Sequence, residues 1–184
     1  VSRKDEEEVI QDHSLFRLFS RLVARSFEDL QTGDEIIRAY VVDLLVRFAR
    51  TDSLYQIRDP VGKRIETVVG LLIEADFRSK EMSSSESFRA LRHTGDYALF
   101  MTGIFRSYVE SHGYVDWYMQ EGPRSYRRAI QVAPTRADTD ILERLWRDFE
   151  QVSGGLDYMR KVYFGQAALQ FGLDALFRRF DAWN

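Results

Sequence analysis

Residues 97–105, with the sequence YALFMTGIF, restrict the fold more than any other segment of the chain. The apolar side chains follow one another too closely to share one face, so a helix here is apolar nearly all round. A helix of that kind is buried among other helices. Ser83 and Glu86 form the pattern of a capping box upstream, and Gly113 provides a stop signal downstream. The sequence therefore predicts a central buried helix over about 84–112.

Apolar residues recur at steps of three and four along most of the remaining chain, and no segment alternates convincingly with period two. Three prolines in 184 residues are few, which favours long helices over a fold with many turns. We expect an all-α, single-domain helical bundle over 1–184 with about six to seven helices. The expected helices cover approximately 13–31, 35–51, 60–80, 84–112, 123–132, 136–152 and 156–183.

Local signals predict several helix ends. Gly33 is expected to take the left-handed conformation after the first helix, and Asp34 to start the second. A short piece that opens at Asp116 is expected before the one that begins near Pro123. The Ser-Gly-Gly run at 153–155 predicts the sharpest break in the chain, between the last two helices.

The composition excludes several classes of chemistry. The chain has no cysteine, which excludes disulfides, zinc–thiolate sites, iron–sulfur clusters and cysteine nucleophiles. It opens with the acidic segment KDEEE at 4–8, from which no signal or transit peptide is expected. Its longest apolar runs are far shorter than the roughly 20 residues of a membrane span. We therefore expect a cytoplasmic protein with no membrane partner.

The charge pattern does not favour nucleic acid as a partner. The formal net charge is −3, and acidic residues lie between the 22 arginines almost everywhere. The densest basic group consists of Arg124, Arg127 and Arg128. It is too small for a nucleic-acid footprint.

Asp96 is the residue that most invites a functional reading. It lies near the start of the buried segment, where a carboxylate must be paired, neutralised or bound to a ligand. His93 precedes it by three residues and shares its side of the helix. An arginine from a neighbouring helix, a hydrogen bond to the imidazole, or a metal or polar ligand would each meet the need. A structural role is the commoner solution, because buried polar networks are usually satisfied within the protein.

Motifs for metal sites and catalysis are weak. A mononuclear metal site can be drawn from Asp76, His93 and Asp96, but the spacing does not require one. The chain has no Glu-x-x-His pair, as a di-iron bundle would need, and only a lone histidine for haem. It also lacks a glycine-rich phosphate loop and a G-x-S-x-G elbow. We predict no catalytic or metal-ligating residue and assign no cofactor.

Two further features bear on packing and binding. Gly95, Ala98 and Thr102 form a stripe of small residues that lets another helix come close. The segment 114–126 is rich in aromatic residues and either lines a pocket or partner surface, or packs as a connector over one end of the bundle. The candidate ligand-binding residues are His93, Asp96, Tyr97, Asp76, Tyr118, Arg124 and Tyr126.

The segments at 92–105 and 115–126 together resemble a pattern found in uncharacterised bacterial proteins. In that pattern a Gly-Asp pair precedes Leu-Phe, a glycine and a phenylalanine, and a Val-Asp-x-Tyr…Gly…Tyr element follows. The matching residues are Gly95, Asp96, Leu99, Phe100, Gly103, Phe105, Val115, Asp116, Tyr118, Gly122 and Tyr126. The resemblance covers about a quarter of the chain, implies a bacterial source and carries no known activity.

These observations favour a non-catalytic module that acts through protein contacts or regulation, as a homodimer or with another protein. The alternative is a small-ligand or metal-binding bundle, an enzyme or a sensor, centred on His93, Asp96 and Tyr97.

Overall fold

The computed structural model describes residues 3–49 and 83–164, and this part of the chain is helical throughout, without strands. The prediction of an all-α, single-domain bundle is confirmed. The expected helix at 60–80, which includes Asp76, lies outside the described residues. The elements are the α-helices α1 Arg3–Asp29, α2 Glu35–Ala49, α5 Ser84–Ile104, α6 Arg106–Ser111, α7 Val115–Ile130, α8 Arg136–Arg147 and α9 Phe149–Met159, and the short π-helix η1 Arg160–Phe164.

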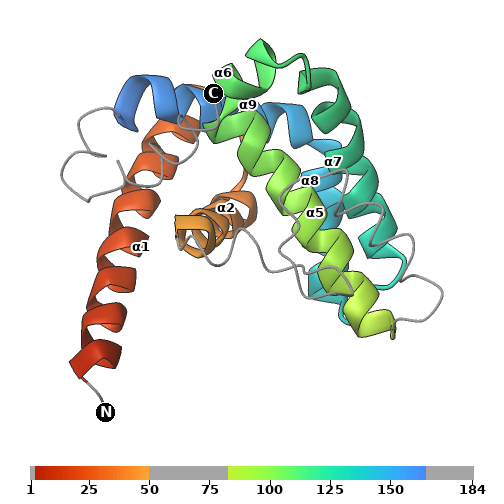
Figure 1. Cartoon of the computed structure of the whole chain (residues 1–184), viewed down its shortest axis with the longest axis horizontal. Helices are drawn as coiled ribbons and strands as arrows, with labels where there is room; N and C mark the ends of the chain where they lie inside the picture. Colours follow the sequence, from red (N-terminus) through yellow and green to blue (C-terminus); the bar gives the residue numbers. More distant parts are fainter. Residues whose placement is uncertain (1–2, 50–82, 165–184) are drawn as a thin grey trace.

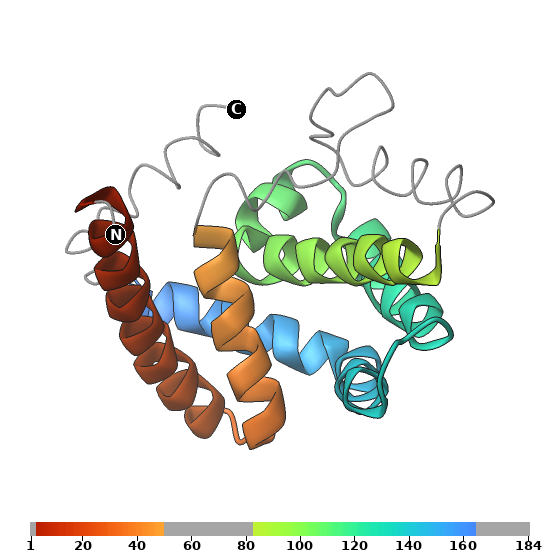
Figure 2. The same ribbon diagram turned by 90° about the horizontal axis from the view of Figure 1, so that it is seen from below.

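The helices pack as neighbouring pairs that cross one another. α1 and α2 lie side by side and are joined by a short turn (Figure 1, Figure 2). α5 packs along α7 and also crosses α9, while α8 packs against α7. Every residue from His93 to Phe105 is buried, as predicted for the central helix. None of the helices in the described ranges combines the length and the apolar character that a membrane span needs.

Several helix ends follow from local signals, as predicted. The Ser83 side chain accepts a hydrogen bond from the Glu86 backbone N–H, and the Glu86 carboxylate accepts one from the Ser83 N–H over 3.0 Å. Asp34 accepts from the Ile37 backbone N–H over 2.9 Å, which caps α2. Gly33 and Gly113 have φ of 65° and 71°, the left-handed conformation that ends a helix. These ends are determined by a few neighbouring residues and need no tertiary contact.

The central helix ends earlier than predicted. α5 stops at Ile104, and Phe105 has φ −109° and ψ 29° between α5 and α6. The Thr102 hydroxyl donates to the Ala98 and Leu99 carbonyls over 2.9 and 3.3 Å. Bonds of this kind bend helices. The segment expected at 84–112 is therefore two helices rather than one.

Two predicted boundaries fall inside helices. The Ser-Gly-Gly run at 153–155 lies within α9, and the chain breaks instead at Asp148, between α8 and α9. A Cβ at Gly155 would lie 2.8 Å from the buried ring of Phe27, so this glycine makes room for α1 rather than ending a helix. The last expected helix, 156–183, accordingly begins too late.

Pro123 does not open a helix either. It lies in the middle of α7, which runs on from Val115 and joins the two expected pieces. A proline inside a helix removes a backbone hydrogen bond. Gly122, just before it, packs so closely on Phe149 that an added Cβ would lie 2.3 Å from the ring. Tertiary packing therefore holds α7 together across the proline.

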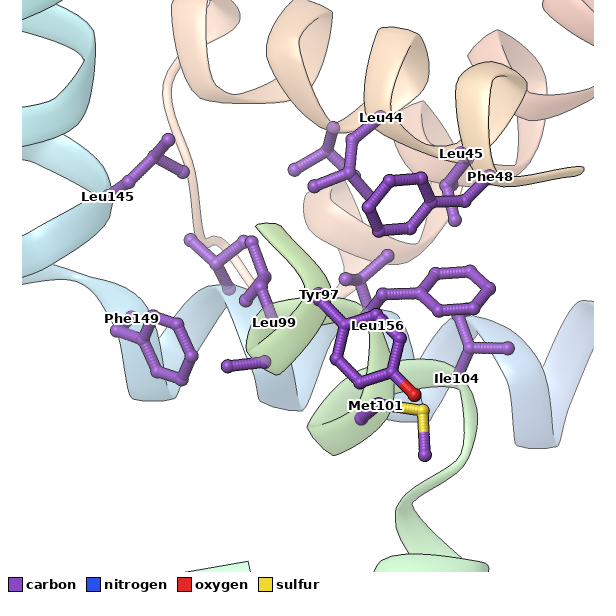
Figure 3. Close-up of a cluster of buried hydrophobic side chains, with 14 of the residues drawn as sticks. Leu44, Leu45, Phe48, Tyr97, Leu99, Met101, Ile104, Leu145, Phe149 and Leu156 are labelled. Atoms are coloured by element: carbon purple, nitrogen blue, oxygen red, sulfur yellow. The ribbon is translucent and has the colours of Figure 1, made fainter. Parts of the chain in front are cut away.

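Side chains from α2, α5, α8 and α9 meet in one hydrophobic cluster (Figure 3). Phe48 of α2 packs edge-on against Phe100 of α5, with ring centroids 5.1 Å apart. Each large apolar side chain that is fully buried here contributes about 1.5–3 kcal/mol to folding. Other members of the cluster are Leu44, Leu45, Tyr97, Leu99, Met101, Ile104, Leu145, Phe149 and Leu156.

The predicted stripe of small residues faces α7. A Cβ at Gly95 would lie 2.6 Å from the Tyr126 ring, and one at Gly122 would lie 3.0 Å from the Ala98 Cβ. Gly103 allows α9 to approach in the same way, because an added Cβ there would lie 2.5 Å from the Leu156 Cβ. The close approach of α5 to both helices depends on these positions.

We predict opposite effects of alanine at two helical glycines. Gly103→Ala should lower the free energy of unfolding by about 1–3 kcal/mol, because the Leu156 Cβ is fixed to the α9 backbone and cannot move aside. Gly154→Ala is the matched control, since an added Cβ there meets nothing within 4 Å. This substitution should raise the free energy of unfolding by about 0.5–1 kcal/mol, because alanine has a higher helix propensity than glycine. Urea denaturation of both variants would measure the difference, and equal midpoints would contradict the close α5–α9 crossing.

Candidate functional site

Asp96 is completely buried and receives hydrogen bonds from two other helices. The hydroxyls of Tyr40 and Tyr126 donate to its Oδ1 over 2.6 and 2.8 Å. Arg47 Nη2 donates to its Oδ2 over 3.0 Å. Tyr40 and Arg47 belong to α2 and Tyr126 to α7, so one carboxylate of α5 links three helices.

A second arginine lies on the same carboxylate. Arg92 Nε is 3.9 Å from Asp96 Oδ2 and donates to the Tyr40 hydroxyl over 2.9 Å. Tyr40 therefore both accepts and donates a hydrogen bond. We call these five residues, Tyr40, Arg47, Arg92, Asp96 and Tyr126, the Asp96 network. Arg47 extends it to the surface, where Nε donates to Asp43 over 2.9 Å.

The position of Tyr126 follows from Gly95. Because Gly95 has no Cβ, the Tyr126 ring lies directly against the α5 backbone. Its hydroxyl then reaches the next residue, Asp96. The Gly-Asp pair thus acts as a unit, in which the glycine admits the ring and the aspartate accepts its hydroxyl.

The other members are positioned by helix periodicity. Tyr40 and Arg47 are seven residues apart on α2, about two turns, and so lie on the same side of it. Arg92 precedes Asp96 by four residues on α5, the spacing at which helix side chains meet. The α2 side chains, rather than its backbone, span the distance to α5.

Burial and charge shift the pKa values of the donors. Burial raises the pKa of Tyr126 well above its usual range, and the charge of Asp96 raises it further. Burial also raises the pKa of Tyr40, with Asp96 adding to the effect and Arg92 opposing it. Burial lowers the pKa of Arg47, but the charge of Asp96 and its hydrogen bond with Arg47 act in the opposite direction, and the pKa rises overall. Both tyrosines therefore stay protonated, and Arg47 stays charged, at neutral pH.

Two predicted site residues, Asp96 and Tyr126, are in direct contact. His93 and Tyr97 flank Asp96 in sequence and are also buried. The His93 ring packs edge-on against Phe48, with centroids 5.6 Å apart. Tyr97 belongs to the hydrophobic cluster (Figure 3).

Tyr118 and Arg124 lie apart from Asp96. Tyr118 contacts Trp117 in the first turns of α7, and burial together with Tyr108 and Tyr114 raises the pKa of Tyr118 to about 12. Arg124 is exposed and pairs with Glu121 over 3.2 Å. Asp76 lies outside the described residues.

Three members of the Asp96 network are missing from the predicted site residues: Tyr40, Arg47 and Arg92. The position of Arg92 four residues before Asp96 is a signal that could have identified it. Tyr40 and Arg47 read as ordinary members of an amphipathic helix. Their contact with Asp96 depends on how α2 crosses α5, which no local pattern encodes.

The arrangement is suited to holding helices together. An ionised carboxylate can only accept hydrogen bonds, and both oxygens of Asp96 already accept from the protein. A substrate proton or a metal ion would have to displace these donors. Among the described residues, no group of three histidines or carboxylates could hold a metal ion.

Comparisons with known proteins add no relative. The chain matches no protein-family model, no curated protein and no solved structure. The resemblance to uncharacterised bacterial proteins stays a prediction.

We predict that the charge of Asp96 stabilises the fold far more than that of Asp43, although Arg47 pairs with both. Asp96→Asn should lower the free energy of unfolding by about 3 kcal/mol or more, because it removes one partner of a buried ion pair. Asp43→Asn should cost less than about 1 kcal/mol, since 59% of the Asp43 side chain is exposed. Urea denaturation at pH 7 would measure both. Equal losses of unfolding free energy in the two variants would show that the buried Asp96 network does not stabilise the fold.

We predict alkaline instability from the raised pKa values of Tyr40 and Tyr126. Above pH about 10 the unfolded chain releases the tyrosine protons and the native state retains them, so stability falls as pH rises. Below pH about 10 the two tyrosines are protonated in both states, so their contribution to the free energy of unfolding does not change with pH. Tyr126→Phe should reduce the slope of the free energy of unfolding against pH by up to about 1.4 kcal/mol per pH unit. Denaturation of the unchanged protein and of Tyr126→Phe at pH 9, 10 and 11 would measure both slopes. Identical slopes would contradict the prediction.

Proposed function

We propose that this protein is a non-catalytic helical module that acts through protein contacts, and that its first partner is a second copy of the chain. The observation that supports this is a group of four aromatic side chains where α6 meets α7, two of them exposed and two partly buried. The junction of the two helices lies at the top of Figure 1. We call this group the aromatic corner and define it as Tyr108, His112, Tyr114 and Trp117.

The rings of the aromatic corner lie close together. The centroids of Tyr108 and His112 are 4.2 Å apart, and those of His112 and Tyr114 are 6.3 Å apart with nearly parallel planes. The His112 Nδ1 also lies 2.8 Å from the Tyr108 carbonyl oxygen and 3.0 Å from the Ser111 hydroxyl. These contacts restrict the His112 ring before any partner binds.

An ordered aromatic surface is typical of a protein interface. Tyrosine and tryptophan supply a large share of binding energy at interfaces, and side chains that are already ordered lose little entropy on binding. Tyr114 is 54% exposed although it is large and partly apolar. A two-fold dimer would bring the same surface of two copies together, the commonest arrangement of homo-oligomers.

The Asp96 network supports a non-catalytic role for the centre of the bundle. Asp96 has no exposed surface, and its hydrogen bonds join α2, α5 and α7. A ligand-binding centre at His93, Asp96 and Tyr97 would require internal donors to be displaced. A bacterial source and a cytoplasmic location remain predictions from the sequence.

We predict that Tyr114→Ala weakens self-association by tenfold or more, because it removes a tyrosine ring of the corner that is 54% exposed. Folding should be unaffected, since the Tyr114 side chain makes no capping hydrogen bond to α7. Sedimentation velocity over a range of concentrations would measure the dimer dissociation constant.

Trp146→Ala provides the matched control. Trp146 is 42% exposed on α8 and stacks with Arg127, away from the aromatic corner. Its removal should leave the dissociation constant within about twofold. A protein that is monomeric at all concentrations, or a dimer weakened by Trp146→Ala and not by Tyr114→Ala, would contradict the proposal.

A further inference from the structure

Two guanidinium groups from different helices converge on one carboxylate oxygen. Arg47 Nη2 of α2 lies 3.0 Å from Asp96 Oδ2, and Arg92 Nε of α5 lies 3.9 Å from the same atom. The two cations are therefore close neighbours. Asp96 is completely buried, whereas 30% of each arginine side chain is exposed. The arginines thus form the outer side of the Asp96 network and reach the surface.

Both arginines keep hydrogen-bond donors that no other described residue uses. Arg47 uses Nε for Asp43 and Nη2 for Asp96, and its Nη1 donates to no group in residues 3–49 and 83–164. Arg92 uses Nε for Tyr40. Within the described ranges, the two terminal nitrogens of Arg92 donate no hydrogen bond. Each guanidinium therefore has N–H groups free to bind a ligand from the solvent side.

The two groups are held in place before any ligand binds. Arg92 is fixed by the Tyr40 hydroxyl, and its guanidinium carbon lies 5.0 Å from the centre of the Tyr40 ring. Arg47 is held between Asp43 and Asp96, with its guanidinium carbon 5.7 Å from the Phe48 ring centre. Because the side chains are already ordered, a ligand would bind without the entropic cost of fixing two flexible arginines.

The local charge favours an anion. Among the described residues, the two arginines pair with one buried carboxylate, Asp96, and Arg47 also pairs with Asp43, which is 59% exposed and screened by solvent. Planar guanidinium groups bind carboxylate and phosphate oxygens through paired, charge-assisted hydrogen bonds.

We propose that Arg47 and Arg92 form a binding site for a small oxyanion, a carboxylate or phosphate group, at the surface between α2 and α5. The site shares no residue with the aromatic corner, which belongs to α6, α7 and the turn between them, and the proposal does not depend on self-association. Asp96 acts as a positioning residue that holds both arginines, and it does not touch the ligand.

Binding of inorganic phosphate and of acetate can be followed by NMR on 15N-labelled protein, through the arginine Nε–Hε signals. The titrations are made against sodium chloride at constant ionic strength. We expect saturable shifts of the Arg47 and Arg92 signals. Saturation with phosphate alone would assign a phosphate group as the ligand, and saturation with both would assign any small oxyanion.

Three variants test the assignment. Arg92→Gln should weaken binding about tenfold or more, because it removes the charge and the terminal donors. Asp43→Asn should tighten binding several-fold, because it removes a competing anion and releases Arg47 Nε. Arg89→Gln is the matched control, since Arg89 is exposed on α5 and, within the described residues, donates to Ser85 rather than to the Asp96 network. It should leave the affinity within about twofold.

The proposal is overturned if neither anion gives saturation, or if Arg89→Gln weakens binding as much as Arg92→Gln. If Arg92→Gln does not fold, the affinity of Asp43→Asn for the anion becomes the test, because this substitution is at the surface and leaves the fold intact. An Asp43→Asn protein with unchanged affinity would then refute the site. A monomeric protein that binds phosphate would contradict the proposed dimer and leave this site intact.

Discussion

The structure depends on the need to satisfy one buried carboxylate. Asp96 is completely buried, and an unpaired charge in such a place would make folding unfavourable. The protein meets this need with Tyr40 and Arg47 from α2 and Tyr126 from α7. Because each donor must reach the same two oxygens, the three helices have little freedom to slide or rotate. Hydrophobic packing tolerates alternative arrangements more readily than a carboxylate with several fixed partners does.

Packing and polarity are linked at the junction of α5 and α7. Gly95 lets the Tyr126 ring lie on the α5 backbone, and the adjacent Asp96 accepts its hydroxyl. Gly122 extends the same contact one turn along α7, against Ala98. Gly95, Asp96, Gly122 and Tyr126 belong to the sequence pattern whose resemblance to uncharacterised bacterial proteins stays a prediction. In this chain, the part of the pattern that they form therefore describes a helix junction rather than a set of reacting groups.

The sequence predicts those features that depend on neighbouring residues. The capping box at Ser83, the Asp34 cap and the left-handed glycines are local, and so is the wide apolar surface of α5. The failures occur where a residue serves a distant contact. Gly155 resembles a helix breaker but makes room for Phe27, and Pro123 resembles a helix start but lies inside α7. The same limit applies to the site. An arginine from another helix is one of three partners considered for Asp96, but the sequence does not identify Arg47, which lies 49 positions away.

The buried side of the Asp96 network holds helices together, whereas its partly exposed side has groups that could also bind an anion. On the inner side, Tyr126 is completely buried, and its bond to Asp96 can only hold α7 against α5. On the outer side, Arg47 and Arg92 are partly exposed, and the donors that hold α2 against α5 belong to the groups that would bind an anion. An anion that draws Arg47 outward would weaken its bond to Asp96, and one that binds through the spare nitrogens would strengthen the arrangement. By linkage, any ligand that prefers one of these arrangements shifts the packing of α2 on α5 by the same free energy. The buried carboxylate thus connects the state of the surface site to the packing of the bundle.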